Sequence, residues 1–146
     1  MEIKIQEIGY QDTLQIRHEA MWPDKALAYV RLPNDEMGRH YALFLQNQLI
    51  SVISLFKEGR SMQFRKFATL PEFQGKGYGT ALLRYIIQLA EGEEIDRIWC
   101  NARIQKSSYY FRFGLRETQE RFEKGGIHFV IMEKYLPKKS ESSFTG

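Results

Sequence analysis

Three glycines at alternate positions are the residues whose spacing most directly suggests chemistry. Gly75, Gly77 and Gly79 lie in the run 74–80, which reads QGKGYGT. Because glycine has no Cβ, the backbone amides of such a run can crowd together around a ligand. The residues that follow are helix-like, and the first amides of a helix have no partner within it and point toward anions. The run therefore predicts a binding site for a phosphate or pyrophosphate group.

Two familiar phosphate-binding loops fit this run poorly. A Walker loop needs a longer gap followed by Gly-Lys-Ser/Thr, whereas Lys76 lies between two glycines. A dinucleotide fingerprint needs a third glycine or an alanine where this chain has Thr80, and an acidic residue at the end of the following strand. Asp96 stands near the required distance, but it precedes a strand-like run. Both interpretations are therefore disfavoured.

A third interpretation fits the loop and its approach. The pattern Gln-x-x-Gly-x-Gly, present here as Gln74, Gly77 and Gly79, resembles the acetyl-CoA pyrophosphate loop of the GNAT superfamily of N-acetyltransferases. The segment 67–72, FATLPE, is similar to the strand that leads into that loop in the family. The resemblance implies acetyl-CoA as the cofactor.

A second segment extends the resemblance. Residues 101–114, NARIQKSSYYFRFG, look like the family's second cofactor segment, in which a tyrosine lies four residues before a glycine. Here Tyr110 precedes Gly114. The two motifs follow in the family's order, and the likeness is good over residues 60–135 and looser over the first sixty. Two motifs in the right order are more specific than one short glycine run.

The resemblance assigns cofactor binding to three groups of residues. Amides of the loop would hold the pyrophosphate, and amides of the preceding strand would bind the pantetheine arm and steady the thioester oxygen. We expect Gln74 to act through its backbone, and Lys76 either adds charge or faces water. The residues implied are Phe67, Ala68, Thr69, Gln74, Gly75, Lys76, Gly77, Tyr78, Gly79, Thr80, Asn101 and Ser107.

Tyr110 is the catalytic residue that the resemblance implies, as the general acid for the departing thiolate. A free tyrosine has a pKa near 10 and a free thiol one near 8.5, so the proton transfer runs uphill by about 2 kcal/mol in water. Tyr110 therefore helps only where desolvation makes the thiolate more basic, or by hydrogen bonding without full transfer. The alternative is an aromatic residue that packs in a short helix.

The general base is harder to assign. Histone-type members of the family carry a glutamate on the strand before the loop, and ungapped alignment on Gly77 and Gly79 places Gln63 there. Glutamine cannot accept a proton. Either water relays the proton, or the amine arrives neutral, or a histidine substitutes, with His128 and His40 as the options. The missing glutamate disfavours a histone-like lysine substrate.

Composition is that of a globular domain. The chain has 146 residues, of which 43% are hydrophobic and 14% aromatic, which argues against disorder. No apolar run approaches the ~20 residues of a membrane span, so we expect no membrane partner. The start of the chain has no apolar core of a signal peptide, and the single Cys100 suits a reducing compartment, which predicts a cytoplasmic protein. The net charge of +3 suits a polyanionic cofactor.

The pattern of apolar residues predicts an α/β fold. We expect one three-layer GNAT-like domain over residues 1–136, with a mixed, mostly antiparallel sheet of about seven strands and four helices, and a flexible tail over 137–146. The helices are expected at 13–21, 24–31, 80–91 and 107–113. The strands are expected at 2–8, 41–45, 49–56, 62–69, 97–102, 115–122 and 127–135.

These features favour an N-acyltransferase that moves an acetyl group directly from acetyl-CoA to a primary amine of a small molecule or peptide. A covalent intermediate is not indicated, because Cys100 has no evident histidine partner. A non-catalytic acyl-CoA-binding regulatory module is the alternative, and Gln63 is its best support. A nucleic-acid-binding domain is disfavoured because the chain shows no basic stripe. We expect no metal, and a homodimer stays open.

Overall fold

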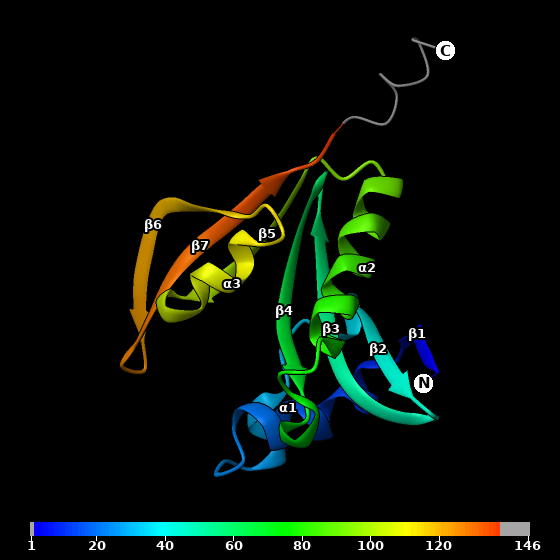
Figure 1. The fold of residues 1–146 in the computed structure, drawn as a ribbon. Helices are drawn as coiled ribbons and strands as arrows, with labels where there is room; N and C mark the ends of the chain where they lie inside the picture. The colour runs from blue at the N-terminus through cyan, green and yellow to red at the C-terminus, as the bar shows by residue number, and fades with distance from the viewer. Residues whose placement is uncertain (1, 138–146) are drawn as a thin grey trace, which may run out of the picture. The chain divides into compact units, whose positions relative to one another are not determined.

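The computed structural model describes residues 2–137, so the predicted tail lies, apart from Pro137, outside the described residues. Within that range, seven strands and three α-helices form the main elements of the fold (Figure 1). The strands are β1 (Ile3–Ile8), β2 (Arg39–Leu45), β3 (Gln48–Glu58), β4 (Ser61–Thr69), β5 (Arg97–Arg103), β6 (Arg116–Lys124) and β7 (Ile127–Tyr135). The helices are α1 (Leu14–Met21), α2 (Tyr78–Gly92) and α3 (Ser107–Phe111).

One sheet contains all seven strands, in the order β1-β2-β3-β4-β5-β7-β6. The pairs β1–β2, β2–β3, β5–β7 and β6–β7 are antiparallel. β4 and β5 pair in parallel over three positions, from Ser61 opposite Arg97 to Gln63 opposite Trp99. The predicted mixed, mostly antiparallel sheet is therefore confirmed.

The prediction of a helix over residues 24–31 is wrong. The described residues therefore contain three α-helices, whereas four were predicted. Only a short 3-10 turn forms there, over Leu27–Val30. Side-chain hydrogen bonds hold the end of this segment and the residues that follow it. Arg17 donates to the Val30 carbonyl oxygen at 3.0 Å, and the Leu32 amide donates to the Asp35 carboxylate at 2.8 Å. The bond from Arg17 spans 13 positions, so it fixes an irregular segment that local propensity alone does not indicate.

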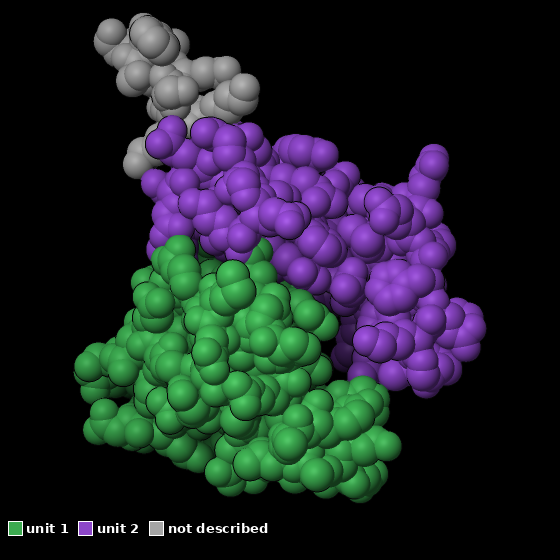
Figure 2. Space-filling model, turned by 180° about the vertical axis from the view of Figure 1, so that it is seen from behind, with its two compact units in different colours: residues 1–56, 64–86 green, residues 57–63, 87–146 purple. Residues whose placement is uncertain are grey.

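The chain is divided into two compact units, which have different colours in Figure 2. The first comprises residues 2–56 and 64–86 of the described chain, and its helices cover both faces of its strands. Arg17 of α1 reaches Ser54 on β3, whereas Ser51, three residues earlier on the same strand, bonds to Thr69 beneath the start of α2. Residues three apart on a strand point to opposite faces. α1 and α2 therefore lie on opposite sides of the sheet in this unit.

The second unit comprises residues 57–63 and 87–137 of the described chain. β5, β7 and β6 form its antiparallel ladder, and α3 packs on β6 and β7 (Figure 1). Gly114, with a left-handed φ of 92°, follows α3 and turns the chain into β6. The buried side chains of this unit include Ile98, Cys100, Phe113, Leu115 and Met132.

None of the helices within residues 2–137 has both the length and the apolar character needed to cross a membrane.

Candidate functional site

The glycine loop passes directly into α2. Gly75 and Gly77 have φ values of 75° and 89°, a left-handed conformation that disfavours residues with a Cβ. The first backbone bond of the helix runs from the Ala81 amide to the Gly77 carbonyl oxygen at 3.0 Å. The amides of residues 78–80 precede this bond, at the N-terminal end of the helix. The predicted combination of a glycine turn and a helix N-terminus is thus present.

Gly79 is required for a different reason, because its φ is not positive. A Cβ built on Gly79 would lie 3.2 Å from Thr69 Oγ1 and 3.3 Å from the Cζ atom of Phe67. Such distances are shorter than ordinary van der Waals contacts. The missing side chain therefore lets the first turn of α2 lie directly against the end of β4.

Side chains from the glycine loop and from β3 hold the end of β4 in place. The Gln74 amide nitrogen Nε2 donates to the Thr69 carbonyl oxygen at 2.8 Å, which closes the loop back onto the strand. The Ser51 hydroxyl donates to the Ala68 carbonyl oxygen at 3.1 Å and lies 2.8 Å from Thr69 Oγ1. The Gln74 side chain thus closes the loop, and the expected role of its backbone toward the cofactor stays a prediction. Ser51 was not predicted, since a lone serine in an apolar strand gives no signal.

A break in the alternation of β4 lies just before this segment. Lys66 has a left-handed φ of 53°, the mark of a β-bulge. Phe64 and Phe67 are three residues apart, yet their rings meet edge to face with centroids 6.3 Å apart, so they share one face. Phe67 also faces Gly79 of α2. Arg65, between Phe64 and the bulge, therefore points to the opposite face, on which α1 lies.

Lys76 and Tyr78 surround the aromatic ring of Phe73. The Lys76 Nζ atom lies 6.0 Å from the Phe73 ring centroid, and the Tyr78 ring meets the same ring edge to face at 6.3 Å. Residues 74–77 are exposed, so the loop presents its backbone to solvent. The structure thus brings together the loop and residues 67–69 of β4, all within the first unit.

Tyr110, Asn101 and Ser107 all belong to the second unit. Tyr110 is a partly buried residue of α3, and its ring meets the Tyr109 ring edge to face at 5.3 Å. Burial raises the pKa of Tyr110 well above its usual range, with smaller contributions from Cys100 and Tyr109. Burial also raises the pKa of Cys100 to about 12, so this thiol stays protonated and is a poor nucleophile.

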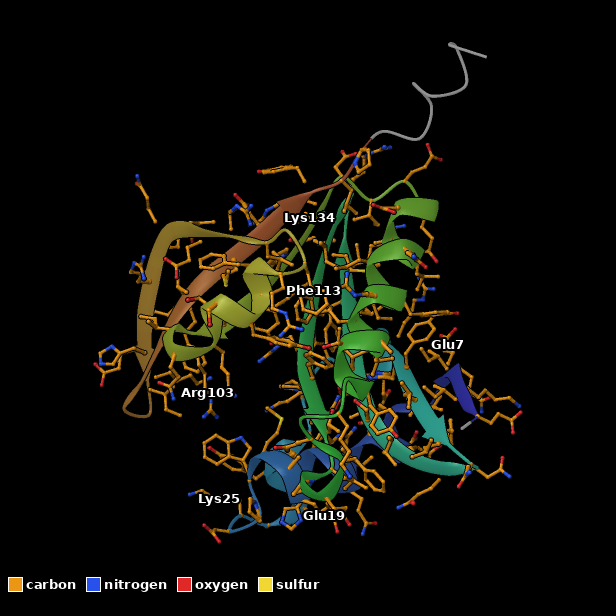
Figure 3. All side chains as sticks on the ribbon, viewed as in Figure 1. Glu7, Glu19, Lys25, Arg103, Phe113 and Lys134 are labelled. Carbon is orange, nitrogen blue, oxygen red and sulfur yellow. The ribbon has the colours of Figure 1, made fainter. Side chains whose placement is uncertain are left out.

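Hydrogen bonds hold α3 on its strands. The Ser107 hydroxyl bonds to the Glu117 carboxylate of β6 and, with Arg121, lowers the pKa of that carboxylate. The Lys134 Nζ atom donates to the Phe113 carbonyl oxygen at 3.1 Å, and Figure 3 labels both residues. Asn101 is exposed on β5, opposite Ile131. Ser107 therefore has a structural bond in addition to any role toward a cofactor.

The two histidines differ in accessibility. His40 is buried, with Nδ1 2.7 Å from Ser54 Oγ and Nε2 2.8 Å from the Asp35 carbonyl oxygen. Both ring nitrogens therefore have structural partners, which leaves neither available to a substrate. His128 is exposed on β7, opposite Glu123 of β6.

A buried ion pair under α1 was not predicted from the sequence. Arg17 and Asp35 are both fully buried and form two bonds, of 2.8 and 2.9 Å. Burial raises the pKa of the Asp35 carboxyl, but the hydrogen bonds from Arg17 and Leu32 outweigh it and leave the pKa below its usual value. Arg17 also bonds to Val30 and Ser54, and only its Nε atom has no partner among the described residues. The pair therefore ties α1, residues 30–35 and β3 together.

Comparison with known proteins decides what this arrangement is. The model of the acetyltransferase (GNAT) domain matches residues 6–136, which include elements of both units. The chain belongs to the GNAT acetyltransferase family. The sequence-based resemblance is thereby confirmed.

Individual GNAT proteins support the same assignment. The uncharacterized N-acetyltransferase YitI of Bacillus subtilis is 27% identical over 144 residues, covering 92% of this chain and 97% of its own. A provisionally assigned N-acetyltransferase from Lactobacillus plantarum has the same fold, with a TM-score of 0.85 and 19% identity, covering 94% of this chain and all of its own. The PaiA N-acetyltransferase of Thermoplasma acidophilum, solved with coenzyme A, has a TM-score of 0.71 and 18% identity, covering 93% of this chain and 100% of its own.

Proposed function

We propose that this protein is an acetyl-CoA-dependent N-acyltransferase that transfers an acetyl group directly to a primary amine of a small molecule or peptide. Membership of the GNAT family supports the reaction class. The observation that carries the proposal is the loop of residues 74–80, where left-handed Gly75 and Gly77 lead into a helix held against β4 by the absence of a Cβ on Gly79.

The loop suits the diphosphate of coenzyme A. Amides of Gly75, Gly77, Gly79 and Thr80 would donate to it at the positive end of α2. Coenzyme A is present in the PaiA structure, and acetyl-CoA in that of a GNAT protein from Elizabethkingia anophelis. We infer that the pantetheine arm runs back from the loop along Phe67, Ala68 and Thr69 of β4. Lys76, Tyr78, Asn101 and Ser107 would complete the cofactor site.

Tyr110 is our proposed general acid. Its raised pKa keeps the phenol protonated at neutral pH, so its O–H can donate to the departing thiolate. The same shift makes it a weaker acid, so stabilisation of the thiolate by a hydrogen bond is favoured over complete proton transfer. Direct transfer fits the raised pKa of the buried Cys100 thiol, which makes it a poor acyl carrier at neutral pH.

A general base on β4 is not required by the proposal. Gln63 cannot accept a proton, and both nitrogens of His40 are occupied. We infer that the amine loses its proton to water or reaches the site neutral. The reaction should therefore quicken as pH rises toward the pKa of the amine, because the neutral fraction of the acceptor grows.

Two glycine variants test the cofactor site. Gly77 and Gly59 both have left-handed φ values, 89° and 63°, and a Cβ on either would meet no atom within 4 Å. Gly77→Ala and Gly59→Ala should therefore carry similar backbone strain, about 1–2 kcal/mol. Calorimetric titration with coenzyme A should show weaker binding for Gly77→Ala alone. Equal affinity in the two variants would contradict a diphosphate site in the loop.

A turnover measurement distinguishes the proposed enzyme from the alternative, a non-catalytic acyl-CoA-binding regulatory module. Thiol release from acetyl-CoA should depend on an added primary amine, and the acetylated amine should appear in equal amount. Tight binding of acetyl-CoA without thiol release across a broad amine panel would favour the non-catalytic module.

A further inference from the structure

Arg65 is a charged residue that the proposed chemistry has not used. It lies on β4, three residues before Ala68, and is partly buried. The bulge at Lys66 separates it from the segment that contacts α2. With regular alternation Arg65 would share a face of the sheet with Phe67. The contact between the rings of Phe64 and Phe67 shows that Phe64 shares that face instead. The bulge therefore directs Arg65 to the face that carries α1.

The buried ion pair on that face is already neutral without Arg65. Arg17 and Asp35 neutralise each other through two short bonds. The Leu32 amide donates a further hydrogen bond to the Asp35 carboxylate. Arg65 adds a second cation near that pair, where the charges of both Arg17 and Asp35 act on it, and its guanidinium makes no hydrogen bond or ion pair of 4.0 Å or less within residues 2–137. Burial, followed by the charge of Arg17, lowers the pKa of Arg65 from its usual value. The guanidinium nevertheless stays protonated at neutral pH, because arginine starts above 12.

We propose that Arg65 binds a carboxylate of the acceptor, so that the acceptor is an amine that also carries a carboxylate, such as an amino acid. This inference rests on the proposed function, because it takes the direction of the bound cofactor from it. A planar guanidinium with two parallel N–H groups matches a carboxylate in geometry as well as in charge. Bonds of this kind would supply the partner that Arg65 lacks.

The position of Arg65 along β4 suits an acceptor rather than the cofactor. The cofactor would enter at the loop of residues 74–80 and run back toward Phe67, with its thioester beside Ala68. Arg65 lies three residues upstream of that end, which is at most about 10 Å from Ala68 at 3.3 Å per residue and less where the bulge at Lys66 shortens the strand. An amino acid would bridge this distance together with the arginine side chain. The diphosphate lies in the other direction, at the far end of the strand.

Matched acceptors give the direct test. Glycine, β-alanine and γ-aminobutyrate would each be compared with the corresponding amide, which keeps the amine and removes the negative charge. Thiol release from acetyl-CoA would be measured for wild type, Arg65→Gln, Arg65→Lys and Arg60→Gln. Arg60 is the control, because it is an exposed arginine of the preceding turn, paired with Asp96 at 2.9 Å.

For wild type, at least one acid should have a higher kcat/KM than its amide. Arg65→Gln should lower kcat/KM for that acid by roughly 10- to 100-fold, the range for a lost hydrogen bond to a charged group. The amide should change little. Arg65→Lys keeps the charge but loses the paired N–H groups, so an intermediate loss is expected. Arg60→Gln should match wild type with both acceptors.

Binding measurements keep the two proposals separate. Calorimetry would follow N-acetylglycine, N-acetyl-β-alanine and N-acetyl-γ-aminobutyrate binding to the coenzyme A-loaded protein, and at least one should bind wild type more tightly than Arg65→Gln. Amine turnover with no preference for acids, or an equal loss with acids and amides in Arg65→Gln, would overturn the role of Arg65 and leave the acetyltransferase intact. Absence of turnover with Arg65-dependent binding would instead overturn the proposed reaction. Arg65→Lys serves the same comparison if Arg65→Gln fails to fold.

Discussion

Replacement of Gly79 by alanine adds one methyl group where α2 meets β4. The backbone itself tolerates the change, because Gly79 is helical and its φ is not positive. The new Cβ would lie 3.2 Å from Thr69 Oγ1 and 3.3 Å from Phe67 Cζ, so the helix start or the strand must shift by a few tenths of an ångström. The amides that we assign to the diphosphate would move with the helix.

Two opposing effects determine the stability of Gly79→Ala. Alanine in place of glycine favours the helix by up to about 1 kcal/mol. Overpacking of a tight contact costs about 1–3 kcal/mol. The net loss in unfolding free energy is therefore about 0–3 kcal/mol. Affinity for coenzyme A should fall by about tenfold or more, since displaced donors lose roughly 1.4 kcal/mol or more of charge-assisted bonding.

A double-mutant cycle identifies the contact responsible. Thr69→Ala removes the Oγ1 atom nearest to the new methyl group, and it also removes the bond to Ser51. The double variant Gly79→Ala/Thr69→Ala should recover part of the lost coenzyme A affinity, with a coupling energy of about 0.5–3 kcal/mol. Calorimetry gives the four affinities, and chemical denaturation gives the four stabilities. Strict additivity of the affinities, or unchanged binding in Gly79→Ala, would refute the steric argument.

Three further predictions concern Tyr110 and the buried ion pair. Tyr110→Phe should lower the rate of thiol release with little change in coenzyme A affinity, and an unchanged rate would remove the proposed acid role. Arg17→Met should lower the unfolding free energy by about 3–5 kcal/mol, because it leaves the Asp35 charge buried without its partner, and denaturant unfolding would measure this. The pKa of Asp35 is lowered in the folded state, so its contribution is complete above its unfolded value near 3.9 and disappears as pH falls through the folded value. Asp35→Asn should accordingly be less stable than wild type at pH 7, with the gap narrowing on acidification, and a constant gap across the acid range would contradict this assignment.

Local patterns explain why most of the fold was predictable. Alternating apolar residues marked the strands, and the apolar stripe of residues 80–91 marked α2. The glycine loop was predictable because few structures require glycine at alternate positions before a helix. The segment 24–31 was not, because its shape depends on Arg17 and Asp35, which are 18 positions apart in sequence. No local rule assigns a buried arginine to the carbonyl group of a distant turn.

The bulge at Lys66 was equally hidden, since lysine rarely adopts a left-handed φ and nothing in the sequence marks it. Its consequence is larger than the local distortion. Residues after the bulge, Phe67 and Thr69, face Gly79 at the start of α2, whereas Arg65 before the bulge lies on the side of the Arg17–Asp35 pair. A single strand thereby presents one set of side chains to the proposed cofactor loop and another to the proposed acceptor. Strict alternation would place Arg65 and Phe67 on one face of the sheet. The bulge at Lys66 is therefore what allows β4 to contribute side chains both to the proposed cofactor loop and to the proposed acceptor site.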